Sequence, residues 1–99
     1  MAPKEQALAL KEELTQMMGS PCMDFQEHCR EGAECRFEAL WRVEGSGYSL
    51  IKVRANLYRA QPSRIHVVFT TNSGNAVGCN FTDAAKVVEA IAAAIKSGN

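Results

Sequence analysis

Three cysteines and one histidine lie within fourteen residues of this 99-residue chain: Cys22, His28, Cys29 and Cys35. Thiolate sulfur and imidazole nitrogen are preferred zinc ligands, so the cluster is a candidate metal site. Its spacing, C-x5-H-C-x5-C, lacks the paired C-x2-C knuckles of structural zinc sites. Adjacent His28 and Cys29 also point in different directions in regular structure, which counts against one ion held by all four residues. We therefore expect no bound metal or cofactor.

The cysteines have two simpler interpretations. A disulfide, for example between Cys22 and Cys35, forms only in an oxidising compartment. The N-terminal stretch MAPKEQALALKEEL lacks the apolar core of a signal peptide, so we expect a cytoplasmic location and reduced thiols. Cys35 and Cys79 occupy inward positions of the sheet predicted below, which suits small buried hydrophobic residues.

Common catalytic sequence patterns are missing from the chain, which has no P-loop, GxGxxG, GxSxG or HExxH motif. A catalytic site needs titratable groups that converge in a pocket. The inward positions of the predicted sheet carry no such group apart from cysteine. No stretch approaches the 18 apolar residues of a membrane span. We predict that the protein is not an enzyme and does not enter a membrane.

Charge is distributed unevenly, although the formal net charge is zero. Residues 1–34 hold seven acids against three bases, and residues 35–66 hold six bases against two acids. The neutral total therefore hides a bipolar molecule. A near-neutral pI argues against a strong nucleic-acid binder, because such domains are usually basic as a whole.

Apolar and polar residues alternate along residues 35–81, which predicts four antiparallel strands. Tight turns around residues 44–47, 59–63 and 72–75 separate them. Strands that follow one another through short turns form a meander. The inward positions of this sheet are apolar: Cys35, Phe37, Ala39, Trp41, Val43, Ile51, Val53, Ala55, Leu57, Ile65, Val67, Phe69, Val77, Cys79 and Phe81.

Two amphipathic helices are predicted outside the sheet. Residues 4–18 carry an apolar stripe at three- and four-residue steps, and Gly19 ends it. Residues 83–96 carry a second stripe, with Thr82 as the expected N-cap. Residues 21–34 are either irregular or a short helix. We predict one α+β domain over residues 1–99, a two-layer α-ββββ-α sandwich with both helices on the apolar face of a four-stranded antiparallel meander.

The opposite face of the predicted sheet carries cations with aromatic and polar side chains between them. Such a face suits single-stranded nucleic acid, because cations pair with phosphates and rings stack on bases. It also suits contact with a protein, and polar residues of this kind are what a solvated sheet face ordinarily carries. The candidate binding residues are Arg36, Arg42, Tyr48, Lys52, Arg54, Asn56, Tyr58, Arg64 and His66.

We predict a small non-enzymatic interaction or adaptor protein that binds itself, as a homodimer, or another protein. The contact would use the exposed sheet face or a sheet edge, because an unpaired edge strand can take up a further strand. The alternatives are a nucleic-acid-binding module that uses the same face and a Cys/His metal or redox module.

Overall fold

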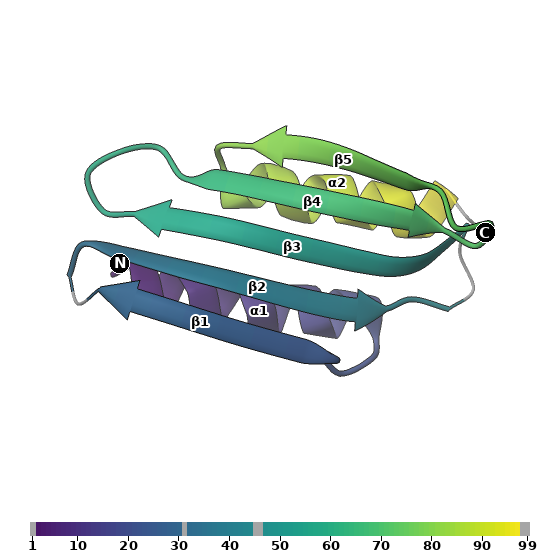
Figure 1. Ribbon diagram of the computed structural model, residues 1–99, viewed down its shortest axis with the longest axis horizontal. Helices are drawn as coiled ribbons and strands as arrows, with labels where there is room; N and C mark the ends of the chain where they lie inside the picture. Colours follow the sequence, from purple (N-terminus) through teal and green to yellow (C-terminus); the bar gives the residue numbers. More distant parts are fainter. Residues whose placement is uncertain (1, 31, 45–46, 98–99) are drawn as a thin grey trace.

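A computed structural model describes residues 2–30, 32–44 and 47–97 of the chain (Figure 1). The predicted turn at 44–47 lies partly outside the described residues. The elements follow one another in the order α1 (Pro3–Met18), β1 (Asp24–Arg30), β2 (Glu34–Arg42), β3 (Tyr48–Tyr58), β4 (Arg64–Thr71), β5 (Ala76–Phe81) and α2 (Ala84–Ser97).

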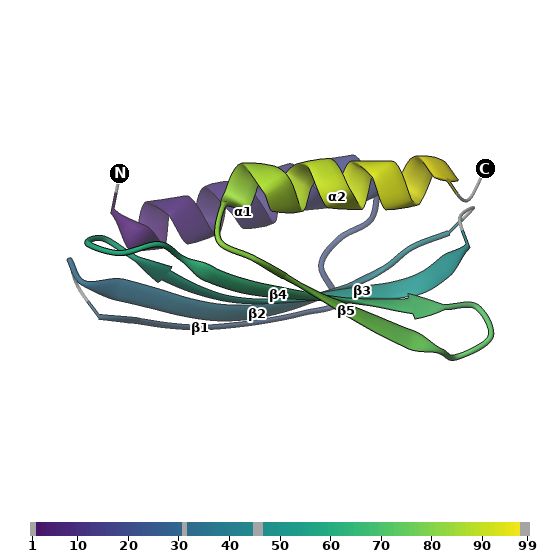
Figure 2. The same cartoon turned by 90° about the horizontal axis from the view of Figure 1, so that it is seen from above.

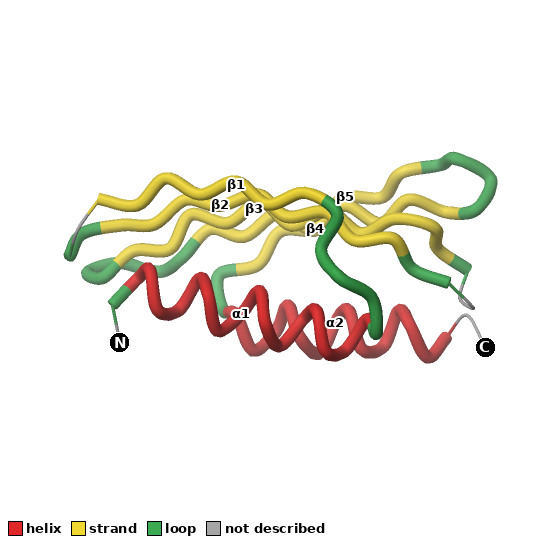
Figure 3. The backbone as a smooth tube through the Cα atoms, turned by 90° about the horizontal axis from the view of Figure 1, so that it is seen from below, coloured by secondary structure: helices red, strands yellow, loops and turns green. Residues whose placement is uncertain are grey.

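The five strands form one antiparallel sheet in the order β1-β2-β3-β4-β5, so each strand pairs with its neighbours in sequence. Both helices lie on the same face of this sheet (Figures 2 and 3). Helix α1 packs over β2 and β3, and α2 packs over β4 and β5. The predicted α+β class is therefore confirmed, whereas the predicted number of four strands is wrong.

The additional strand is β1, which replaces the irregular segment or short helix predicted for residues 21–34. It pairs with β2 over its whole length, from Asp24 opposite Leu40 to Arg30 opposite Glu34. Only Phe25 and Cys29 of this strand are partly buried, and its other residues are exposed. The ring of Phe25 lies 5.8 Å from that of Phe37 in the core. An edge strand with so few buried residues gives only a faint alternating pattern.

The core lies between the inner face of β2, β3 and β4 and the two helices. Every predicted inward residue of these three strands and the adjoining Val43 is at most 7% exposed. Ala7, Leu10 and Leu14 cover them from α1, and Val87 and Ile91 from α2. Within the core, the indole N–H of Trp41 donates a hydrogen bond to Thr15 Oγ1 at 3.1 Å.

The residues at the ends of α1 and α2 explain where these helices begin or stop. Proline occupies the first turn of α1, and Gly19 ends the helix with a φ of 70°, a conformation that favours glycine. At α2 the backbone N–H of Ala85 donates to Asp83 Oδ1 at 2.9 Å. Asp83 is therefore the N-cap, in place of the predicted Thr82. Neither described helix is long and apolar enough to cross a membrane.

Two side chains lie elsewhere than the alternation predicts. The register between β3 and β4 shifts between Tyr48 and Leu50, and this bulge reverses the facing of Tyr48. The ring of Tyr48 consequently lies 5.4 Å from that of Phe69, against the core. Val77, predicted inside, is 53% exposed. It lies in β5 near the β4–β5 hairpin, which bends away from the helices (Figures 2 and 3).

Two leucines of α1 differ in burial, so replacing each by alanine should change the stability of the fold by different amounts. Leu14 is fully buried and Leu8 is 44% exposed. We expect Leu14→Ala to lower the free energy of unfolding by about 2–5 kcal/mol, because it removes apolar contacts and leaves a cavity. The matched Leu8→Ala change should cost less than about 1 kcal/mol. Urea denaturation of both variants checks this, and equal losses would contradict the placement of α1.

Candidate functional site

Eight of the nine predicted face residues do lie together on the open face of the sheet, opposite the helices. The register sets them in neighbouring rows, with Arg36 opposite Asn56 and Arg54 opposite His66. Tyr48 is the ninth, and the bulge described above removes it from this face. The aromatic surface predicted for base stacking is therefore reduced. The eight residues are Arg36, Arg42, Lys52, Arg54, Asn56, Tyr58, Arg64 and His66.

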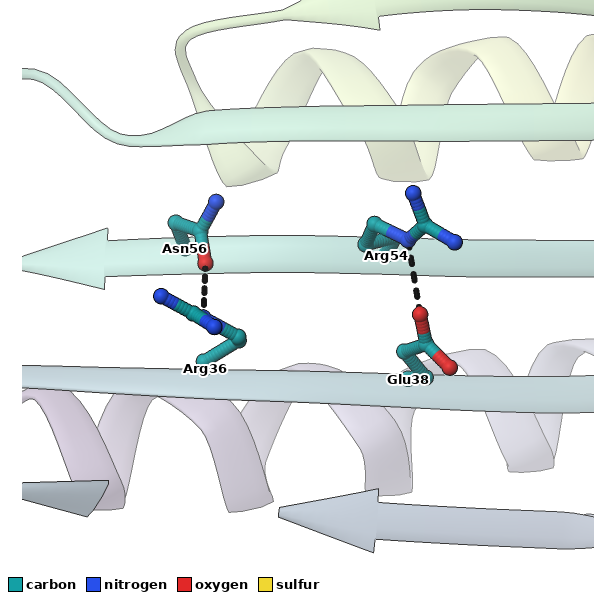
Figure 4. A network of polar contacts seen from close by, with 4 residues as sticks. All are labelled: Arg36, Glu38, Arg54 and Asn56. Carbon is teal, nitrogen blue, oxygen red and sulfur yellow. Dashed lines mark hydrogen bonds and ion pairs between the residues drawn. The ribbon is translucent and has the colours of Figure 1, made fainter. Parts of the chain in front are cut away.

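Two of the arginines on this face make polar contacts with side chains on the neighbouring strand, across the β2–β3 pair (Figure 4). Arg54 Nε donates to Glu38 Oε1 at 2.7 Å, in an ion pair between directly opposite residues. Arg36 Nε donates to Asn56 Oδ1 at 3.1 Å. Part of the hydrogen-bonding capacity of Arg36, Arg54 and Asn56 is thus used within the face.

A shallow hollow of about 170 Å³ lies next to this network, lined by Lys52, Arg54, His66 and Val68. The Nδ1 atom of His66 lies 2.8 Å from Asn80 Oδ1 on β5. The imidazole also lies against Gly78, where a Cβ atom would come within 2.9 Å of His66 Cε1. A glycine at position 78 therefore leaves room for this ring orientation.

Strand β1 adds residues to the open face that the sequence analysis missed. Gln26 and His28 pair with Glu38 and Arg36, so they share the facing of those residues. Arg30, at the end of the strand, lies 4.0 Å from Glu34 in an exposed ion pair. The ion pairs between described residues leave four face cations without a carboxylate partner: Arg36, Arg42, Lys52 and Arg64.

The cysteine–histidine cluster does not come together as one four-residue site. Cys29 and Cys35 lie directly opposite each other on β1 and β2, their Cα atoms 3.9 Å apart, and a disulfide joins them. His28 faces the open side of the sheet, because it pairs with Arg36. Cys22 lies at the far end of the β1–β2 pair, where its thiol donates to the carbonyl of Asp24. The disulfide suggested between Cys22 and Cys35 is therefore wrong.

The two edges of the sheet differ in charge. Strand β1 has the sequence DFQEHCR, and charged side chains of this kind protect an edge against pairing with another strand. Strand β5 has the sequence AVGCNF, with no charge and no proline. Among the described residues, no further strand pairs with β5 beyond β4. The outer edge of β5 is therefore open to a further strand.

The register shows which polar backbone groups this edge presents. The N–H of Thr71 donates to the carbonyl of Asn75, so these residues are a hydrogen-bonded pair. Hydrogen-bonded and non-hydrogen-bonded pairs alternate along an antiparallel ladder. Ala76, Gly78 and Asn80, paired with Thr70, Val68 and His66, are consequently the non-hydrogen-bonded members. Their N–H and C=O groups point away from β4, toward the open edge.

Comparison with known proteins gives no relative for this chain. No protein-family model matches it, and neither a curated protein nor a solved structure shows a significant match.

The Arg54–Glu38 pair is expected to contribute little to stability, because both side chains are more than a third exposed. A double-mutant cycle of Arg54→Ala and Glu38→Ala should give a coupling free energy of about 0.2–1 kcal/mol. Molar salt should reduce it further. A coupling above about 2 kcal/mol, insensitive to salt, would show instead that this pair is shielded from solvent.

Proposed function

We propose that this chain is a small non-enzymatic interaction protein that pairs with a second copy of itself along the open edge of β5. The observation that carries the proposal is that the edge strand β5 has no charged residue. Its Val77 side chain is 53% exposed. Natural sheets usually protect an edge by charges, proline or a covering element. The other edge of this sheet follows that rule, and β5 does not.

The backbone supports a two-fold antiparallel contact. Residues 76, 78 and 80 present their polar groups outward, so two copies can exchange hydrogen bonds only between even-numbered positions. A two-fold axis at Gly78 pairs Gly78 with Gly78 of the second copy and Ala76 with its Asn80. An axis at Cys79 would instead need Thr82, which lies beyond the end of β5. The Gly78 register therefore uses the strand more fully.

The side chains of β5 suit this arrangement. In the Gly78 register, Val77 lies opposite Cys79 of the second copy, on the side of the sheet that carries the helices. Both are apolar, and Val77 would lose water-exposed surface, which favours association by about 25 cal/mol per Å² of apolar area buried. No like charges on β5 oppose each other. The strand is thus complementary to itself in backbone and in side chains.

Val77→Lys is expected to weaken the dimer at least about tenfold, because it brings two positive charges to the contact. Val77 is already largely exposed in the single chain, so the variant should fold normally. Sedimentation over a range of concentrations measures the dimerisation constant. Gln26→Lys, a matched new lysine on the β1 edge, should leave it unchanged. A wild-type chain that stays monomeric at millimolar concentration would overturn the proposal.

A second candidate is the binding of single-stranded nucleic acid on the open face. It is supported by the four cations there without a carboxylate partner and by the neighbouring ring of His66. Loss of Tyr48 from this face counts against strong stacking. The two candidates use different surfaces, so each can be tested in the absence of the other.

If the face binds nucleic acid, Lys52→Ala together with Arg64→Ala should weaken binding and flatten its dependence on salt, because two phosphate contacts disappear. The control is Arg30→Ala, which removes a cation that already lies next to Glu34. Fluorescence anisotropy of a labelled oligonucleotide at low salt measures both. No binding by the wild-type chain at low salt would eliminate this candidate.

A further inference from the structure

We propose that Glu27, Cys29 and Cys35 form a site for a thiophilic metal ion such as Zn²⁺ or Cd²⁺ when the two cysteines are reduced. The disulfide between the same two sulfurs is then the closed, metal-free form of the site. The site lies on the β1–β2 pair, at the opposite edge of the sheet from the contact proposed along β5.

The sheet register brings these three residues together. Cys29 lies directly opposite Cys35, and Glu27, two residues before Cys29, faces the same side of the sheet. Their ligand atoms, two sulfurs and a carboxylate oxygen, all lie within 4.8 Å of one another. Two sulfurs bound to one tetrahedral zinc ion, each about 2.3 Å from it, lie about 3.8 Å apart. In the reduced chain the two sulfurs must move apart to this separation, and a rotation of the long Glu27 side chain then brings its carboxylate to the ion as the third ligand.

The ligand types define the class of ion. Two thiolates select soft or borderline ions such as Zn²⁺ and Cd²⁺ over Mg²⁺ or Ca²⁺, which prefer oxygen ligands. Three protein ligands leave one tetrahedral position for water. This ligand set differs from the candidate cluster of Cys22, His28, Cys29 and Cys35 considered in the sequence, because it includes Glu27 and leaves out Cys22 and His28.

Solvent reaches the site from one side. Cys29 is partly exposed and borders a hollow of about 430 Å³ between β1 and the start of α1, where Pro3, Lys4 and Glu5 also lie. Cys35 is fully buried. An ion can thus reach Cys29 from the hollow, whereas the Cys35 side of the site is shielded from solvent by the core.

The two forms interconvert by thiol–disulfide exchange. In a reducing compartment both cysteines are thiols, and metal binding releases their two protons. A low-molecular-weight disulfide reverses this: one thiolate attacks it and expels one thiol, and the second thiolate then displaces the other. The cysteines lose two electrons, the oxidant is reduced to two thiols, and the ion is released.

The test uses the full chain, reduced and transferred to anaerobic buffer without thiols. Cd²⁺ is added and the ultraviolet thiolate-to-metal absorbance is recorded. We expect one equivalent to bind, and excess oxidised glutathione to release it. Cys29→Ser should abolish the absorbance, and Glu27→Gln should weaken Cd²⁺ binding about tenfold or more. The matched control, Cys22→Ser with Cys79→Ser, removes the two cysteines outside the site and should bind as wild type does.

Alkylation of the wild-type chain gives a second readout that does not depend on variants that fold. Bound Cd²⁺ should protect Cys29, the partly exposed cysteine of the pair, from iodoacetamide, and leave Cys22 and Cys79 as reactive as before. Peptide mass mapping locates the modified residues. The proposal is overturned if the reduced chain binds no Cd²⁺, or if Cd²⁺ protects Cys22 or Cys79 in place of Cys29.

Discussion

The packing of α1 and α2 against the inner face of β2, β3 and β4 is the interaction on which the other surfaces of this chain depend. It buries Trp41, Phe37 and Ile51 completely and so fixes which way every residue of these strands faces. A shift of one residue in register would bring Arg54 and Lys52 into the core. The open face and the exposed cations on it are therefore a direct consequence of burying the alternate positions.

This arrangement leaves one sheet face and two edges uncovered, and the three surfaces differ chemically. The face is polar, and part of it is occupied by its own contacts between Arg54 and Glu38 and between Arg36 and Asn56. The β1 edge is charged, and behind it Cys29 and Cys35 join β1 to its neighbour. The β5 edge alone is uncharged, so it is the surface best suited to a further strand.

The sequence predicted the parts of the fold where many residues repeat one pattern. The alternation from Cys35 to Phe69 gave the facing of three central strands, because each of them buries its inner residues. Strand β1 was missed because Glu27 stands between Phe25 and Cys29 on its inner face. The alternation of apolar and polar residues is broken there, and the sequence of this edge strand resembles that of a polar loop. The Cys29–Cys35 pair could not be seen without β1, since register and not spacing brings the two cysteines together.

Irregularities at single residues also limit how much of the fold the sequence pattern can predict. The bulge before Leu50 reverses Tyr48, and the alternation of apolar and polar residues does not reveal this shift. Val77 fits the inward pattern of β5 and still lies 53% exposed, because the hairpin bends away from the helices. Sequence periodicity gives the facing of a residue, whereas its burial depends on whether another element covers it.

Amide hydrogen exchange in β5 tests the central claim most directly, because it reads the edge backbone without any substitution. The amides of Gly78 and Asn80 point away from β4, so the single chain leaves them to solvent. If a second copy pairs with this edge, their protection should rise with protein concentration, and that of Ala39 in the core should stay constant. Fast exchange of Gly78 and Asn80 at every concentration would contradict the account.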